Sequence, residues 1–205
     1  MSARIRLPVN ADAAAVAAVY APIVEGTAIS FETVAPSADE MADRMAQTLE
    51  VHPWLVWEIG GEVAGYAYAT THRPRSAYRW SVDTSVYISA SHRRSGAGRG
   101  LYISLFAILA AQGYVNAFAG ITLPNPASIG LHESLGFEPI GIYRKVGFKL
   151  GAWHDVGWWQ VALRERGPSP REPLPLADVT ASPEWTSMLA RGESAVRGVE
   201  PGCES

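Results

Sequence analysis

A strand, a glycine-rich turn and a helix follow one another directly between residues 81 and 112. The segment 81–88 alternates apolar and polar side chains, as a strand with one buried face does. The turn HRRSGAGRG (92–100) then sets a glycine at every second position among three arginines, ahead of the apolar stretch LYISLFAILAAQ. A basic, glycine-rich turn at a helix start predicts an anion-binding site, because free backbone N–H groups and the helix dipole both favour negative charge there.

Two familiar phosphate-binding loops do not fit this turn. A P-loop ends in Gly-Lys followed by Ser or Thr, whereas Arg99 follows Gly98 here. The dinucleotide fingerprint needs a third glycine where Leu101 stands, and it opens a series of βαβ units. The pattern R-x-x-G-x-G does fit, and we expect the backbone N–H groups from Arg94 to Gly98 to surround a pyrophosphate. The alternative is a plain glycine-rich turn with solvated arginines.

The remaining patterns predict a mixed sheet covered by helices. The expected order is strand, two helices, three strands, helix, strand, helix and two strands. Gly60-Gly61 predicts a hairpin between two of the strands. This order predicts one α+β domain of mixed α/β layers over residues 1–164. From residue 165 to 205 the sequence is rich in proline and charge, and we expect a disordered tail with a short helix after Ser182.

Composition excludes several classes of protein. A net charge of −3 over 205 residues argues against a nucleic-acid-binding protein. No apolar stretch approaches the roughly 20 residues of a membrane span, so we expect no membrane association. The single cysteine, Cys203, excludes an internal disulfide, and a cytoplasmic location is expected. The five histidines lack metal-ligand spacing, so no metal site is expected.

Five separated segments carry a closer resemblance. They are YAPIVEGTAISFET, RSAYRWSVDTSVYIS, HRRSGAGRGLY, LPNPASIGLHESLGF and VGFKLGAWHDVGWWQ. Together they resemble the phosphinothricin (methionine sulfoximine) N-acetyltransferase family of the GNAT superfamily, over about residues 3–164. The resemblance implies the GNAT acyl-CoA N-acyltransferase fold: a central, mostly antiparallel sheet with two splayed parallel strands, and helices on both faces. It also implies acetyl-CoA as co-substrate and a homodimer.

The resemblance places acetyl-CoA in a gap between the strands that contain SVYIS and VNAFAGI. The backbone of the first strand would pair with the pantetheine arm, and the glycine-rich turn would hold the pyrophosphate. Two residues of PNPAS would contact the CoA arm. The cofactor-binding residues implied are Val86, Tyr87, Ile88, Arg94, Ser95, Gly96, Ala97, Gly98, Arg99, Asn125 and Ser128. For Asn125, the alternative is a turn residue between two prolines.

The resemblance also implies a catalytic base and acid. Asp83 stands where the family usually has glutamate, and a carboxylate there can take a proton from the acceptor amine. Because aspartate is one methylene shorter, a bridging water or a different substrate position would be needed. His132 would protonate the leaving thiolate. The alternatives are an exposed strand aspartate and a packed helical histidine.

The acceptor site is expected to contain Phe31, Arg75 and Tyr78. An arginine fork suits a carboxylate or phosphinate group, although a basic surface loop is the alternative for Arg75. Ser30 departs from the asparagine that the family often has. We therefore predict an acetyltransferase that moves the acetyl group of acetyl-CoA to the amino group of a small acidic amino acid or analogue, of phosphinothricin or methionine sulfoximine type. The alternatives are a GNAT acetyltransferase for another small amine, and a CoA-binding module without catalysis.

Overall fold

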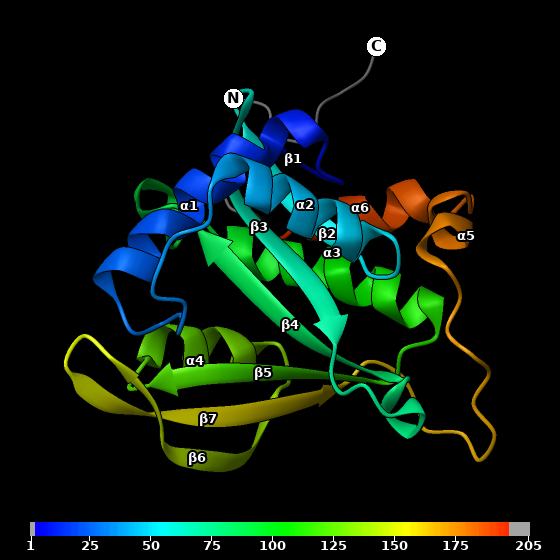
Figure 1. Ribbon diagram of the computed structural model, residues 1–205. Helices are drawn as coiled ribbons and strands as arrows, with labels where there is room; N and C mark the ends of the chain where they lie inside the picture. The colour runs from blue at the N-terminus through cyan, green and yellow to red at the C-terminus, as the bar shows by residue number, and fades with distance from the viewer. Residues whose placement is uncertain (1–2, 197–205) are drawn as a thin grey trace.

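The computed structural model describes residues 3–196 of the 205-residue chain; Cys203 lies outside the described residues. Seven strands form one sheet (Figure 1). The strands are β1 (Ala3–Arg6), β2 (Trp54–Ile59), β3 (Glu62–Thr71), β4 (Ser81–Ile88), β5 (Asn116–Leu123), β6 (Glu138–Lys149) and β7 (Ala152–Ala162).

Within residues 3–196, six α-helices and three short 3-10 turns connect and cover the strands. The helices are α1 (Ala13–Gly26), α2 (Ala38–Leu49), α3 (Ala97–Gln112), α4 (Pro126–Ser134), α5 (Leu176–Thr180) and α6 (Trp185–Glu193), and the 3-10 turns are η1 (Asn10–Asp12), η2 (Ser76–Tyr78) and η3 (Ala90–His92). From β1 to β7 the order of strands and α-helices is the one the sequence predicts.

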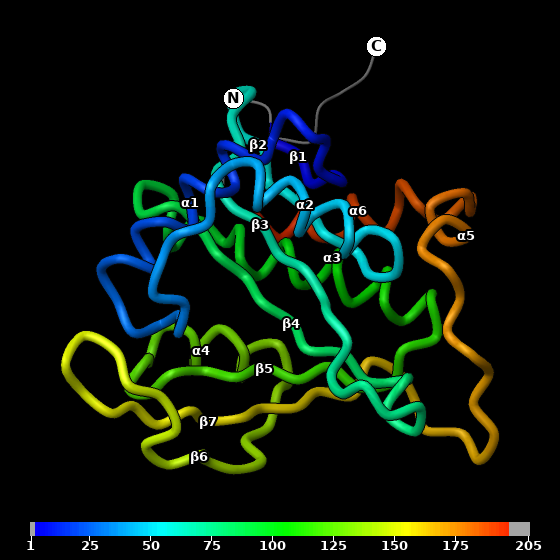
Figure 2. Tube along the Cα trace, in the orientation of Figure 1, coloured from blue at the N-terminus to red at the C-terminus, as the bar shows by residue number. Residues whose placement is uncertain are grey.

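The strand order in the sheet is β1-β2-β3-β4-β5-β7-β6. Every neighbouring pair is antiparallel except β4 and β5, which are parallel. That parallel ladder joins only residues 81–83 to residues 116–118, and beyond it the two strands diverge (Figure 2). The sheet is therefore opened in its middle, as the resemblance implies.

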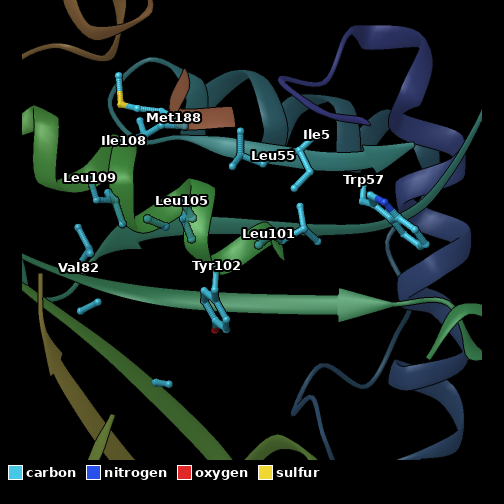
Figure 3. Packing of buried hydrophobic residues seen from close by; sticks show 14 of the residues in the cluster. Ile5, Leu55, Trp57, Val82, Leu101, Tyr102, Leu105, Ile108, Leu109 and Met188 are labelled. Atoms are coloured by element: carbon cyan, nitrogen blue, oxygen red, sulfur yellow. The ribbon is translucent and has the colours of Figure 1, made fainter. Parts of the chain in front are cut away.

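Two apolar clusters fill the spaces on either side of the sheet. Successive residues of β2 alternate between them: Leu55 and Trp57 face the α3 side, whereas Trp54 and Val56 face α1 and α2. On the α3 side, one face of the helix packs into this cluster, with Leu101, Tyr102, Leu105, Ile108 and Leu109 fully buried (Figure 3). The sheet thus carries helices on both faces and fixes the helix that follows the glycine-rich turn.

The C-terminal segment is folded as far as the structure describes it. Helix α6 packs along α3 and beside β1, and Met188 is buried among the residues of the α3 cluster (Figure 3). Glu193 accepts a hydrogen bond from the backbone N–H of Ile5 in β1 at 2.7 Å. The expectation of a disordered tail from residue 165 is therefore wrong for residues 165–196, because a few buried apolar side chains anchor the segment.

None of the helices in residues 3–196 is long and apolar enough to span a membrane.

Candidate active site

The sheet is open between β4 and β5, where the two parallel strands part. The parallel ladder stops at the pair Asp83–Phe118. Within residues 3–196, the edge of β4 that faces β5 therefore has no strand partner from Thr84 onward, whereas the opposite edge of β4 pairs with β3 up to Ile88. Val86, Tyr87 and Ile88 lie on this free stretch, as the acetyl-CoA prediction requires. An extended ligand can add to such an edge as a strand would.

A cavity of about 60 Å³ lies in this gap. Its walls come from both strands, from α3 and α4, and from the loop after α1. The lining residues include Val86, Tyr87, Tyr102, Ile121, Asn125, Ser128 and His132. Five predicted residues therefore meet around one opening: Val86, Tyr87, Asn125, Ser128 and His132. Asp83 and Ile88 do not line it.

The glycine-rich turn leads directly into α3, as the sequence predicts. Arg94 has φ 64° and Gly96 has φ 89°. Left-handed residues close together in a turn direct successive N–H groups to one side, which is the geometry of an anion nest. The helix begins at Ala97, so Gly98 lies in its first turn rather than in the loop. A Cβ on Gly98 would lie 3.3 Å from the Leu131 side chain.

Positive charge surrounds this loop. Arg93, Arg94 and Arg99 are exposed, and the Arg99 guanidinium donates to the backbone oxygen of Ser134 at 2.9 Å, which ties the loop to the end of α4. A pyrophosphate would meet free N–H groups, a helix N-terminus and arginine side chains at one place. These observations fit the phosphate end of acetyl-CoA.

Asn125 caps helix α4. Its side-chain oxygen accepts from the backbone N–H of Ser128 at 3.1 Å, so Asn125 fills a structural role while it also lines the cavity. A contact between Asn125 and the CoA arm stays a prediction. Ser128 lies on the same wall and is bonded to His132.

His132 is buried, and hydrogen bonds fix its ring at both nitrogens. Its Nδ1 lies 2.7 Å from the backbone oxygen of Ser128, and its Nε2 lies 2.9 Å from the hydroxyl of Tyr102. Because a carbonyl oxygen only accepts, Nδ1 carries the hydrogen, and in the neutral ring Nε2 accepts from Tyr102. Burial lowers the pKa of His132 and raises the pKa of Tyr102. The sequence does not distinguish Tyr102 from the other core residues of α3, so its contact with His132 was not predicted.

Asp83 is half-buried at the point where β4 and β5 part, and it is bonded to a histidine. Its Oδ1 lies 2.6 Å from Nδ1 of His72, the residue that follows β3. Burial raises the pKa of Asp83, and the His72 hydrogen bond acts in the opposite direction. The carboxylate is therefore one half of an Asp–His pair rather than an isolated base.

The loop after α1 carries Phe31 to the β6–β7 hairpin. Phe31 lies against Gly147 so closely that a Cβ there would overlap its ring. Lys149, a buried residue of β6, donates to the backbone oxygens of Val24 and Ser30 at 2.6 and 2.7 Å and holds the loop in place. Ser30, at the position where the family often has asparagine, is buried and lies 2.6 Å from the Tyr20 hydroxyl.

The basic loop after β3 places its residues differently. Tyr78 is exposed and meets the His72 ring edge to face, with ring centroids 5.9 Å apart. Arg75 is exposed and lines a groove with Pro173 and other residues, away from Asp83. Arg73 instead extends over the Trp158 ring at 5.8 Å. The structure therefore brings Tyr78 and Arg73 to the Asp83 region, but not Arg75.

A second cavity, of about 220 Å³, lies beside the Asp–His pair. It is lined by His72, Arg73, Phe118, Ile140, Gly141, Tyr143 and Trp158. One wall therefore carries an imidazole and a guanidinium, and aromatic rings supply much of the rest. Among residues 3–196, no cluster of three or more His, Cys, Asp or Glu side chains is placed to hold a metal ion.

The sequence profile described as "Acetyltransferase (GNAT) domain" matches residues 5–158. The chain belongs to the GNAT acetyltransferase family. This confirms the predicted fold and enzyme class.

Several relatives resemble this GNAT acetyltransferase over most of its length. Phosphinothricin N-acetyltransferase of Streptomyces viridochromogenes is 40% identical over 176 residues, which cover 86% of this chain and 94% of the relative. L-methionine sulfoximine/L-methionine sulfone acetyltransferase of Pseudomonas aeruginosa is 38% identical over 165 residues, covering 80% and 96%. A crystal structure of a phosphinothricin acetyltransferase from Sinorhizobium meliloti in complex with AcCoA has a TM-score of 0.80 and 36% identity, covering 85% and 96%.

Sequence reasoning missed His72 in this GNAT acetyltransferase. The signal was the register of the β3–β4 hairpin, in which Thr71 pairs with Val82. That register sets His72 opposite Ser81 and diagonally beside Asp83, on the same face of the sheet. A histidine inside a basic loop carries no such signal when the loop is considered alone.

Proposed function

We propose that this GNAT acetyltransferase moves the acetyl group of acetyl-CoA to the amino group of a small acidic amino acid or analogue, of the phosphinothricin or methionine sulfoximine type. One observation carries the proposal. The parting of β4 and β5 leaves a free strand edge beside the glycine-rich turn, and a carboxylate–imidazole pair stands where the two strands part. The names of the relatives support the acceptor class.

The cofactor contacts follow from the geometry of the gap. In this proposal the free backbone edge at Val86–Ile88 pairs with the pantetheine arm, and the N–H groups of residues 94–99 hold the pyrophosphate. The N–H groups of β4 also polarise the thioester carbonyl. Asn125 and Ser128 line the opposite wall and contact the arm. When bound, acetyl-CoA supplies the thioester; the chain itself binds it and moves the protons.

Proton transfer needs a base for the acceptor and an acid for the leaving sulfur. The Asp83 pair supplies the base. For His132 to serve as acid, Nε2 must carry a hydrogen; the Tyr102 oxygen then accepts from Nε2, and the Tyr102 hydrogen is free to turn toward the cavity. Burial lowers the pKa of His132 and so makes its protonated ring a stronger acid.

The acceptor would lie on the α1–α2 face of the sheet, under the loop that carries Phe31. Tyr78 borders His72 there. Arg73 supplies the cation beside the 220 Å³ cavity, whereas Arg75 would have to swing inward to reach the acceptor. A guanidinium suits a carboxylate or phosphinate by paired hydrogen bonds.

The test is release of CoA thiol from acetyl-CoA, followed with a thiol-reactive dye over a panel of amines. We expect phosphinothricin and methionine sulfoximine to accelerate release far more than amines without an acidic group. Acceleration by other amines alone would favour a different small acceptor. Acetyl-CoA binding with no release for any amine would favour the CoA-binding module and contradict the proposal.

We further propose a homodimer in the cytoplasm. A homodimer is supported by a run of exposed apolar side chains on β6, on its turn and at the start of β7: Ile140, Ile142, Tyr143, Val146, Phe148, Leu150 and Trp153. An apolar patch of this kind marks an interaction surface. Light scattering after size exclusion should give twice the chain mass for the wild type and the chain mass for Phe148→Glu. A monomeric wild type would contradict the dimer, and cell fractionation tests the location.

A further inference from the structure

The His72 ring is held firmly on the acceptor side of the sheet. It stacks on Phe118, with ring centroids 4.2 Å apart and planes inclined by 14°. Tyr78 and Trp158 meet it edge on, and its Nδ1 lies 2.6 Å from Asp83 Oδ1. Three aromatic contacts and a short hydrogen bond together leave the ring little rotational freedom.

The hydrogen bond to Asp83 decides which nitrogen of His72 can act as a base. An ionised carboxylate only accepts hydrogen bonds, so Nδ1 carries the ring hydrogen and Nε2 keeps its lone pair. Within residues 3–196, no protein group forms a hydrogen bond to His72 Nε2, and this nitrogen is not among the fully buried polar atoms. It is therefore accessible. Its ring also lines the 220 Å³ cavity. The nitrogen able to take a proton is therefore the one left open to a ligand.

Chemistry favours the imidazole over the carboxylate as the proton acceptor. The ordinary pKa of an aspartate carboxyl is about 4, so an ionised carboxylate is a weak base. The ordinary pKa of an imidazole is about 6.5, which makes it a stronger base for an acceptor ammonium near neutral pH. A carboxylate bonded to Nδ1 holds a histidine in the correct tautomer and stabilises the charged ring, as it does in hydrolytic triads. The charged and titratable groups around the ring are Asp83 from β4, Tyr78 from η2, Tyr143 from β6 and Arg73 from the loop.

We propose that His72 Nε2 is the general base of this enzyme and that Asp83 is the residue that positions it. The inference rests on the proposed acetyl transfer. Nε2 takes one proton from the acceptor ammonium, and Asp83 stabilises the resulting imidazolium. The amine nitrogen then forms a bond to the thioester carbonyl carbon, and the C–S bond breaks with its electron pair on sulfur. His132 protonates the thiolate through the Tyr102 hydroxyl, the second proton lost by nitrogen restores the His132 proton through solvent, and His72 returns the first proton to solvent.

Two substitutions separate the base from the hydrogen bond. His72→Asn keeps an amide N–H near the position of Nδ1, which can still donate to Asp83, but has no basic nitrogen. We expect kcat/KM to fall about 10²- to 10³-fold, the range for loss of a general base, with acetyl-CoA affinity within about twofold of wild type. For His72→Ala, which opens the site, added imidazole should restore part of the rate. A merely structural role would not give this rescue.

Asp83→Asn tests the positioning role. Loss of the carboxylate removes the stabilisation of the imidazolium, so the acidic limb of the pH profile of kcat/KM should move to lower pH while a limb remains. The matched control is His52→Gln, because the His52 ring is bonded to the hydroxyls of Thr71 and Tyr114, both at 3.1 Å, rather than to a carboxylate; the kcat/KM of this variant should stay within about twofold of wild type.

The outcomes are distinct. A His72→Asn variant with nearly wild-type kcat/KM, together with an Asp83→Asn variant that lacks the acidic limb, would make Asp83 the base and overturn this inference alone. A wild-type enzyme that releases thiol with no amine of the panel would overturn the proposed function and this inference together. Histidine ¹⁵N shifts give a readout without turnover: a neutral His72 that carries its hydrogen on Nε2 would also contradict the proposal.

Discussion

Helix α6 approaches α3 so closely that a single methyl group at Gly192 should part them. A Cβ on Gly192 would overlap the backbone oxygen of Gly100 and the hydroxyl of Ser104, and a Cβ on Gly100 would lie 2.6 Å from the oxygen of Gly192. Because the main obstacle is backbone of a helix locked into the core, no side-chain rotation relieves the overlap. In Gly192→Ala the helix α6 must therefore shift away from α3.

Two opposing effects set the size of the change. Replacing glycine by alanine inside a helix gains up to about 1 kcal/mol of helix propensity. Overpacking costs about 1–3 kcal/mol, and we take the upper value because backbone is struck. The net effect on the free energy of unfolding is a loss of about 2 kcal/mol, which lowers Tm by about 4–8 °C for a chain of this size.

Gly130→Ala in α4 is the matched control, because nothing lies within 4 Å of the added methyl group. Propensity acts alone there, so Tm should rise by about 2–4 °C. Thermal unfolding followed by circular dichroism measures both variants. Titration calorimetry should show weaker acetyl-CoA binding by Gly192→Ala, because Gly100 lies in the first turn of α3, next to the glycine-rich turn. A Gly192→Ala protein at least as stable as the wild type would show that the two helices are not held at this contact.

Two other predictions concern buried polar groups. Burial lowers the pKa of His52 to about 4, so as the pH falls below the ordinary pKa of about 6.5 the unfolded chain gains a proton that the folded chain does not, and the free energy of unfolding decreases. Measured by urea unfolding, His52→Gln should lose about 2 kcal/mol less of this free energy than the wild type between about pH 7.5 and pH 5. Equal losses in the two proteins would contradict the assignment. Lys149→Met leaves the backbone oxygens of Val24 and Ser30 without their donor, so the free energy of unfolding should fall by about 2 kcal/mol. The KM for the acceptor should rise more than the KM for acetyl-CoA. Equal changes in both KM values would show that Lys149 does not act through the loop that carries Phe31.

Local patterns predicted the fold and the position of the glycine-rich turn well. The alternation in 81–88, the glycine-rich turn and the helix after it are signals contained within short segments, and the structure has each of them in place. Gly96 adopts the left-handed backbone that glycine favours. The order of strands and helices followed from the same kind of periodicity.

The acceptor end depends on contacts between distant segments and was predicted less completely. His72 and Asp83 come into contact only through the register of β3 and β4. Arg73 reaches Trp158 only because β7 pairs with β5. The docking of residues 165–196 was missed for a related reason. A proline-rich, charged segment has few apolar residues, yet Met188 and its neighbours suffice when α3 offers a surface that fits them.

The hydrogen bond between Glu193 and the N–H of Ile5 joins the first strand to the last helix of the described chain. Strand β1 lies at one end of the sheet, where an open backbone edge invites pairing with another molecule. Strand β1 precedes its cover, α6, in the chain and is therefore synthesised earlier. Throughout translation, then, a growing chain has an uncovered margin, and a product ending before α6 would never close it. Aggregation during expression should therefore concentrate in C-terminally shortened chains, even when every residue of the active site is present.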